Sequence, residues 1–355
     1  MPEPCDMVWS SQRTTPAQVE AKLRAMLIDR HGVFAGCVPA RTLNLICVVD
    51  APSLAALLDR LRSLSPGHAS RAIVCSVAPQ RADIGAVATV GSDMHPRPGE
   101  FAVLRETVVL DIGERHLPHL ASIVDPLVVS DVPTVVWSPS DRDDAVRTLA
   151  ELVDVVLLDS MDPASPSTAI HRTRGWLEVA RVVDLAWLRT EPWRERLAAS
   201  FHPAGLRADL ERIRAVTVRH HPGSSVAALL LVGWLAAQLE WRPRPLEVTG
   251  SRRHGVAAAR RGEVRLALVP SAGQQVPGLA GLTLETVTGR TLTLDRAPGG
   301  LLARERLGSG EMRSWTLLGA SRGEAGILGE ALRAALVADG VYGRAVRAAG
   351  TFAAQ

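Results

Sequence analysis

The chain has 355 residues, a hydrophobic fraction of 47% and a formal net charge of +3, from 40 basic and 37 acidic residues. This hydrophobic fraction excludes a disordered or fibrous chain, and the length predicts two domains. The near balance of charge argues against a dedicated nucleic-acid-binding protein, and a single lysine, Lys22, argues against a Schiff-base enzyme or a P-loop NTPase.

The first part of the sequence alternates helical and strand patterns. Thr14 and Thr15 before Pro16 predict a helix start, because a hydroxyl caps the first turn and proline suits the first helical position. Apolar spacing continues that helix to about Arg30. Such alternation predicts an α/β layered domain with a mixed sheet. The other predicted strands are 41–49, 71–78, 84–90, 104–112, 134–137 and 155–159, and the other predicted helices are 54–64, 117–129 and one from 141.

Two prolines and small polar residues at 162–167 predict a domain boundary. We therefore expect an N-terminal α/β domain at 1–163 and a C-terminal α+β domain at 164–355. The C-terminal domain begins with a helical part, with helices to about 179, at 187–200 and at 225–239 and a strand at 216–219. Short apolar runs divided by glycine and proline predict an antiparallel meander in a β-rich part at 244–318, before terminal helices at 324–338 and 342–349.

The sequence contains no recognisable targeting or membrane-spanning pattern. Its start, Met-Pro-Glu-Pro-Cys-Asp, lacks the apolar core of a signal peptide. The longest apolar run, Val226 to Ala237, is shorter than the ~20 residues that a membrane-spanning helix needs. The four cysteines share no CxxC spacing, which favours reduced core thiols over a zinc ribbon or a disulfide framework. We therefore expect a cytoplasmic protein without membrane attachment.

One segment matches a nucleophile motif. Gly319 to Gly323 fits the G-x-S-x-G elbow, but no histidine follows Ser321 to take its proton. Ser321 with Glu324 is better explained as a capping box at a helix start. No G-x-G-x-x-G opens a helix after a strand, so the dinucleotide-binding fingerprint is also lacking. The sequence therefore predicts no catalytic residues and no cofactor site.

Two histidines have a spacing that metal sites also use. His116 and His119 could present two imidazoles on one helical face, with Asp111 and Asp131 completing the ligand set. Pro118 near a helix start explains the same segment without a metal. Two histidines are a weak signal, so we predict no metal site.

Tryptophan is unusually frequent, with eight residues against one tyrosine and four phenylalanines. Trp187 and Trp193 lie close to Arg189 and Arg194, a composition typical of protein-interface anchors, although core packing explains a tryptophan as well. The basic stretch at 252–265 has no interleaved aromatic residues for base stacking, so we expect no nucleic-acid partner.

Several segments, in order, resemble the glucose-6-phosphate dehydrogenase assembly protein family, OpcA. The resemblance covers nearly the whole chain, and it departs from the family at Trp137-Ser138, where two tryptophans are frequent, and at Glu240, where glycine is common. The matching segments are Thr42-Leu-Asn-Leu, SIVDPLVVSDVPTVVWSPSD (122–141), VVLLDS (155–160), DLAWLRTEPWRERLAASF (184–201), VAALLLVGWLAAQLEW (226–241) and the terminal helix with Val341-Tyr342.

The resemblance implies a non-enzymatic assembly factor and allosteric activator of glucose-6-phosphate dehydrogenase. Such a protein acts on the oxidative pentose phosphate pathway by binding and stabilising the active enzyme oligomer, and it needs no cofactor. The alternative is an α/β enzyme or metabolite sensor that binds sugar phosphates through its arginines. The residues expected to contact the dehydrogenase are Trp187, Arg189, Trp193 and Arg194, with Trp137 and Asp141 as a second patch.

Overall fold

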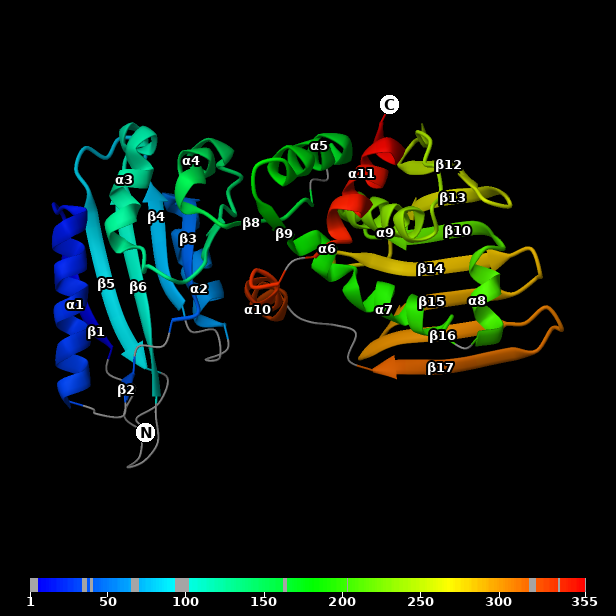
Figure 1. Cartoon of the computed structure of the whole chain (residues 1–355), viewed down its shortest axis with the longest axis horizontal. Helices are drawn as coiled ribbons and strands as arrows, with labels where there is room; N and C mark the ends of the chain where they lie inside the picture. The colour runs from blue at the N-terminus through cyan, green and yellow to red at the C-terminus, as the bar shows by residue number, and fades with distance from the viewer. Residues whose placement is uncertain are drawn as a thin grey trace. The chain divides into compact units, whose positions relative to one another are not determined.

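The computed structural model describes residues 6–33, 37–38, 41–64, 70–92, 102–161, 165–202, 204–318, 324–337 and 339–354 (Figure 1). They pack into two compact units. Unit 1 comprises Met1–Leu158, Ala180–Val183 and Leu328–Leu336, and unit 2 comprises Asp159–Val179, Asp184–Ile327 and Val337–Gln355. The chain thus returns to unit 1 in two short segments, whereas the sequence suggested a single boundary after residue 163. A hydrogen bond from Arg181 to the carbonyl of Ala335 joins these two segments.

Unit 1 is built on a mixed sheet with the strand order β1-β5-β6-β4-β3-β7-β8-β9, and β2 pairs with β6. β6, β4, β3, β7 and β8 run parallel, whereas β5 is antiparallel to both β1 and β6. The strands are β1 (Met7–Ser11), β2 (Cys37–Val38), β3 (Leu43–Asp50), β4 (Ser70–Val77), β5 (Gly85–Ser92), β6 (Ala102–Ile112), β7 (Thr134–Trp137), β8 (Val155–Leu158) and β9 (Arg181–Asp184).

The central strands of unit 1 are buried along their length. β3 is buried from Leu43 to Val49, and every residue of β7 and β8 is buried. Parallel strands covered on both faces are expected to be nearly continuous apolar runs, and these segments fit that pattern apart from Asn44 and Thr134. The helices of this unit are α1 (Pro16–Val33), which contacts β5, α2 (Leu54–Arg62), which contacts β3, α3 (Leu120–Val124) and α4 (Asp143–Thr148).

Unit 2 contains an eight-stranded sheet with the order β11-β12-β13-β10-β14-β15-β16-β17. Only β10 and β13 pair in parallel; the other neighbours are antiparallel. The predicted α/β and α+β classes are confirmed, although β10 is inserted into the predicted meander. The strands are β10 (Ile213–His220), β11 (Glu247–Thr249), β12 (Arg252–Ala259), β13 (Gly262–Pro270), β14 (Leu279–Thr286), β15 (Thr291–Ala297), β16 (Gly300–Arg306) and β17 (Met312–Leu318).

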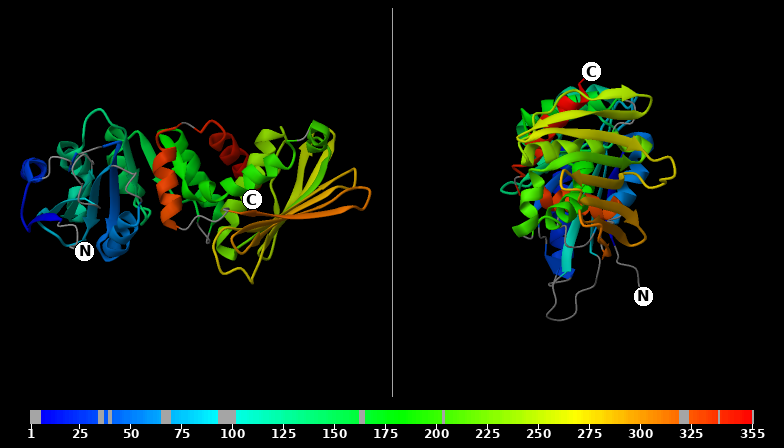
Figure 2. Two further views of the ribbon diagram at one scale, coloured as in Figure 1. Left: turned by 90° about the horizontal axis from the view of Figure 1, so that it is seen from below. Right: turned by 90° about the vertical axis from the view of Figure 1, so that its right-hand side faces the viewer.

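The helices of unit 2 gather on one side of this sheet (Figure 2). α9 is the central helix, and it contacts β10 and β13 as well as α5, α6 and α11. It is buried almost all round, as its apolar sequence predicts. The helices are α5 (Pro166–Leu177), α6 (Leu185–Arg189), α7 (Glu191–Ala199), α8 (Ala204–Leu210), α9 (Ser225–Gln238) and α11 (Tyr342–Ala353), while α10 (Glu324–Ala334) contributes to both units.

Two local differences from the predicted elements have physical reasons. The single helix predicted at 187–200 is two helices, α6 and α7, divided at Thr190. Pro192 in the first turn of α7 has no N–H to continue a helix from α6. Glu240, after α9, has a left-handed φ of 56°, a backbone conformation that glycine adopts more readily than glutamate. Among the described residues no helix has the length and apolar character needed to cross a membrane.

Candidate functional site

Three of the six predicted contact residues are tryptophans that the structure places in the interior. The exposed fractions are 1% for Trp137 in β7, 3% for Trp187 in α6 and 2% for Trp193 in α7. In this folded state the indoles offer no surface to a partner. The difference from the expectation has a simple reason, because a large apolar ring stabilises the fold most when it is buried.

Trp187 is enclosed by side chains that are far apart in sequence. Its Nε1 donates a hydrogen bond to Asp339 Oδ2 at 2.8 Å, and its ring centre lies 5.4 Å from that of Tyr342. The Arg194 guanidinium stacks over the indole at 3.5 Å, and Arg194 Nε donates to Thr190 Oγ1 at 3.0 Å. Burial lowers the pKa of Arg194 to about 10, so it stays charged at neutral pH. The half-buried Arg194 thus covers one face of the Trp187 indole in a cation–π contact.

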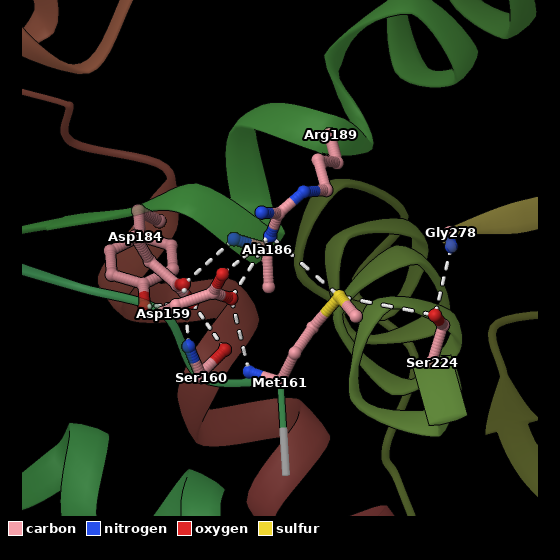
Figure 3. A network of polar contacts seen from close by, with 9 residues as sticks. Asp159, Ser160, Met161, Asp184, Ala186, Arg189, Ser224 and Gly278 are labelled. Carbon is pink, nitrogen blue, oxygen red and sulfur yellow. Dashed lines mark hydrogen bonds and ion pairs between the residues drawn. The ribbon is translucent and has the colours of Figure 1, made fainter. Parts of the chain in front are cut away.

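Arg189 ends α6 and holds the segment that follows β8. Its Nη1 lies 2.9 Å from both carboxylate oxygens of Asp159 and 3.7 Å from the sulfur of Met161 (Figure 3). Ser224, at the start of α9, donates toward the same sulfur and accepts a hydrogen bond from the Gly278 backbone at 2.8 Å. This chain of contacts connects α6, the post-β8 segment, α9 and the start of β14 within unit 2.

Next to Asp159 lies Asp184, which is fully buried and begins α6 as its N-cap. Its Oδ1 accepts hydrogen bonds from the backbone N–H groups of Ser160 and Ala186 at 3.0 and 2.9 Å. Its Oδ2 accepts from the hydroxyls of Ser160 and Tyr342 at 2.6 and 2.7 Å. Burial, and then the charge of Asp159, raise the pKa of Asp184 despite these donors.

The network around Asp184 organises the fold, and its described members form no set of groups arranged for catalysis. The Ser160 hydroxyl donates to a carboxylate, and no imidazole of the described residues bonds to it to activate it as a nucleophile. The Tyr342 hydroxyl is likewise engaged, and burial raises its pKa well above the ordinary value. What the arrangement does is connect α11, near the end of the chain, to the start of α6.

The second predicted patch lies in unit 1, at the end of β7. The Arg60 guanidinium lies 4.8 Å from the ring centre of Trp137. Asp141 is exposed and has a left-handed φ of 54°, which aspartate tolerates better than most residues. Arg142, beside Asp141, could not be singled out from the sequence, because two of its partners, Asp50 and Glu114, come from the ends of other strands. Arg142 binds Glu114 through two hydrogen bonds of 2.8 and 3.1 Å, and also Asp50 and Asp144.

This cluster occupies the edge at which the parallel strands of unit 1 end. The hydrogen bonds that Arg142 donates to Asp144 and Glu114 raise the pKa of Arg142 above its ordinary value, while Arg142 lowers the pKa of Asp144. Phosphate-binding α/β proteins usually have a glycine-rich turn at this edge. Here a single guanidinium is surrounded by carboxylates, so the edge is unsuited to a phosphate.

The other residues weighed from the sequence have local roles where they are described. His116 Nδ1 accepts a hydrogen bond from the Gly113 N–H at 2.9 Å, and burial lowers the pKa of His116. No group of three histidine, cysteine or acidic side chains in the described ranges could hold a metal ion. Cys47 and Cys75 are free, buried thiols, and burial raises the pKa of both. Ser321 lies outside the described residues.

Unit 2 also has a broad sheet face that its helices do not cover. Along β10, Val216 and Val218 are buried, whereas Thr217 between them is only half-buried. Thr217 pairs with Ala267 on one side and Thr283 on the other, and Thr283 pairs with Thr293. We call this face, with Ala267, Thr217, Thr283 and Thr293 at its centre, the open face. Arg304 and Ser314 continue the row across β16 and β17.

The open face was visible in the sequence only as alternation. Runs such as TLTLD at 291–295 place threonine and leucine on opposite faces of a strand. That alternation predicts one covered face and one polar face. It does not show which strands stand side by side, because the order depends on the insertion of β10 between β13 and β14.

Two family models match this chain. One, OpcA_G6PD_assem, describes the N-terminal domain of a glucose-6-phosphate dehydrogenase subunit and matches residues 62–175. The other, OpcA_G6PD_C, describes the C-terminal domain of the same protein and matches residues 180–346. Together they cover most of the sequence and both of its units.

Curated relatives match over a shorter stretch. The OxPP cycle protein OpcA of Nostoc punctiforme is 28% identical over 142 residues, which is 39% of this chain and 30% of the relative. The protein of the same name from Synechococcus elongatus is 25% identical over 142 residues, 39% of this chain and 32% of the relative. The match therefore spans about a third of the length of these relatives.

Solved structures resemble the chain only distantly. Apo scyllo-inositol dehydrogenase from Lactobacillus casei has a TM-score of 0.45 and 10% identity, over 88% of this chain and 96% of that one. A super-repressor mutant of Gal80p from Saccharomyces cerevisiae has a TM-score of 0.44 and 9% identity, over 83% of both chains. Similarities this weak do not indicate a function.

Proposed function

Because the chain belongs to the OpcA family of glucose-6-phosphate dehydrogenase assembly proteins, we propose that it is a non-enzymatic assembly factor and allosteric activator of that dehydrogenase. In this proposal it binds the dehydrogenase and stabilises its active oligomer in the oxidative pentose phosphate pathway. A protein that binds one conformation of an enzyme better than another raises the population of the first by its difference in affinity.

The observation that carries the proposal is the open face of unit 2, and we take it as the surface that contacts the dehydrogenase. Eight hydrogen-bonded strands form a continuous surface, and the helices of the unit lie on its other side. Alanine and threonine at its centre are short enough to let a partner approach the backbone closely, and each threonine hydroxyl can donate or accept a hydrogen bond.

The charged networks around Asp184 and Arg142 support a structural role for these residues rather than a catalytic one. In unit 2 Asp184 is satisfied by four donors, and in unit 1 Arg142 is held by three carboxylates. Groups that are this fully engaged stabilise a fold, and a catalytic acid or base needs a free position for the substrate.

The proposal is tested by mixing the full chain with its cognate dehydrogenase. We expect a complex in size-exclusion chromatography with light scattering, and a lower apparent KM or a larger dehydrogenase oligomer. Thr217→Arg places a long charged side chain at the centre of the open face and should weaken binding by roughly 10-fold or more.

Thr249→Arg is the matched control, because Thr249 is exposed on β11 at the edge of the same sheet. It should bind like the unchanged chain, and both variants should keep the melting temperature. If the unchanged chain affects neither the size nor the kinetics of the dehydrogenase, the assembly function is contradicted. If Thr217→Arg binds normally, the open face is not the contact surface.

A further inference from the structure

One end of the eight-stranded sheet carries a concave feature separate from the Asp184 network. The loop between β13 and β14, together with residues of β10, β14, β15 and β16, lines an open cavity of about 530 Å³. That volume lies within the range of small-molecule sites. We call this cavity the arginine cleft; its polar lining includes Arg219, Ser271, Gln274, Asp295, Arg296 and Arg304.

A single carboxylate holds two of the three guanidiniums side by side. Arg219 Nη2 lies 2.6 Å from Asp295 Oδ1, and Arg304 Nη1 lies 3.0 Å from Asp295 Oδ2. Arg219 Nη1 also donates to Thr283 Oγ1 at 3.1 Å. Since each guanidinium has five N–H donors, both arginines keep donors for a ligand. Asp295 thus fixes two positive charges in position and neutralises one.

Gly281 makes room for the Arg219 guanidinium on the sheet. Gly281 on β14 stands between Arg219 on β10 and Asp295 on β15 in the strand register. A Cβ at Gly281 would collide with the guanidinium group of Arg219. The guanidinium therefore crosses the backbone of β14 at Gly281 to reach Asp295. A larger residue at position 281 would occupy the space that the guanidinium fills.

Arg296 supplies a third positive charge to the cleft. Its Nε donates to the carbonyl of Leu279 at 3.1 Å, and no carboxylate in the described ranges lies within ion-pair distance of it. Burial lowers the pKa of Arg296, although an arginine remains charged at neutral pH. Gln274 Nε2 donates to the carbonyls of Val276 and Leu279 at 2.9 and 3.1 Å and so shapes the loop wall beside Arg296.

We propose that the arginine cleft binds the phosphate group of a phosphorylated sugar-sized molecule. Among the described lining residues, three guanidiniums against one carboxylate leave two uncompensated positive charges, which suit a phosphate dianion. Guanidinium N–H groups bind phosphate oxygens in pairs, with stronger hydrogen bonds than neutral donors make. None of the described residues that line the cleft is aromatic, so a nucleobase would have no stacking partner, and a sugar phosphate is the better fit.

The test is calorimetric titration of the full chain with glucose 6-phosphate, inorganic phosphate and glucose, at constant ionic strength. We expect both phosphates to bind and glucose not to bind. The double variant Arg219→Gln, Arg296→Gln removes two charges and should weaken binding of both phosphates by roughly 10-fold or more.

Arg244→Gln is the matched control, because Arg244 is an exposed arginine that pairs with Glu263 at 3.0 Å. It should bind glucose 6-phosphate like the unchanged chain, and all variants should melt at the same temperature. Absence of phosphate binding at millimolar concentration, equal binding by the double variant, or an equal loss in Arg244→Gln would each overturn the proposal. So would a double variant that loses only dehydrogenase binding, since that outcome assigns the cleft to acidic groups of a protein. Phosphate binding is measured on the chain alone, so its failure leaves the assembly function untouched.

Discussion

At the residue scale, single charged side chains connect segments that are distant in sequence. Asp184 caps α6 and also accepts a hydrogen bond from Tyr342, which is 158 positions later in the chain. Arg142 joins the ends of three strands through Asp50, Glu114 and Asp144. Asp184 is fully buried, so its hydrogen bonds are stronger than the same contacts at the surface would be, and an unpaired partner would be costly. The carboxylates around Arg142 are 45–60% exposed, so water screens these ion pairs and each contributes less.

The raised pKa of Asp184 predicts a pH-dependent contribution to stability. A carboxyl whose folded pKa lies above the ordinary value of 3.8 stabilises the fold fully below that value, and this stability is lost as pH rises through the folded pKa. In Asp184→Asn the amide oxygen accepts from the Ser160 and Ala186 N–H groups, and the amide nitrogen donates to the hydroxyls of Ser160 and Tyr342. We therefore expect the free energy of unfolding of this variant, relative to the unchanged chain, to rise as pH increases above about 4.

Urea unfolding at several pH values in this range measures that difference. Tyr342→Phe serves as a comparison, because it removes one donor and keeps the carboxyl. A relative stability of Asp184→Asn that falls as pH rises would mean that the folded state favours the carboxylate, and the assigned direction would be reversed.

At the scale of elements, α9 and α11 approach each other closely enough to require a glycine. A Cβ at Gly233 of α9 would collide with the backbone carbonyl of Ala345 and would crowd Ala349, both on α11. Since α9 also contacts β10 and β13, it cannot move away from α11 without losing contacts to the sheet. The close pair thus determines where α11 places Tyr342 relative to α6.

We expect Gly233→Ala to destabilise unit 2 by about 1–3 kcal/mol, the usual cost of overpacking. Gly175→Ala, within α5, is the matched control, since a Cβ there meets no atom within 4 Å. It should stabilise by up to about 1 kcal/mol, because alanine is the better helix former. Denaturant unfolding of both variants provides the measurement, and an equal gain in stability for both would show that α9 and α11 are not in close contact.

At the scale of the whole molecule, the sequence predicts individual helices and strands better than it predicts which of them lie side by side. The short strand predicted at 134–137 and the meander strand predicted at 291–295 are confirmed as β7 and β15. The break at Thr190 was missed because the apolar spacing continues across it, although Pro192 was a signal. The short strand β9 was missed because its four residues have no alternation of their own.

The candidate sites were less predictable than the helices and strands, because their residues come together only through the pairing of distant segments. Arg219 and Asp295 are 76 positions apart, and they meet only because β10 lies beside β14. The sequence singled out Trp187 and Arg194 by composition, but composition does not reveal that the arginine covers the indole. Tertiary pairing of this kind leaves no local pattern, whereas the family resemblance depends on long segments and was found from the sequence alone.

The most direct test of the central claim is a labelling footprint of the open face in the complex. In Thr217→Cys the new thiol stands at the centre of that face, and in Thr249→Cys it stands on the exposed edge strand β11. Mass spectrometry follows the alkylation rate of each thiol with and without the cognate dehydrogenase. We predict that the dehydrogenase slows labelling at position 217 by roughly 10-fold or more and leaves position 249 unchanged. Equal labelling rates at position 217 in the free chain and in a demonstrated complex would contradict the claim that this face binds the dehydrogenase.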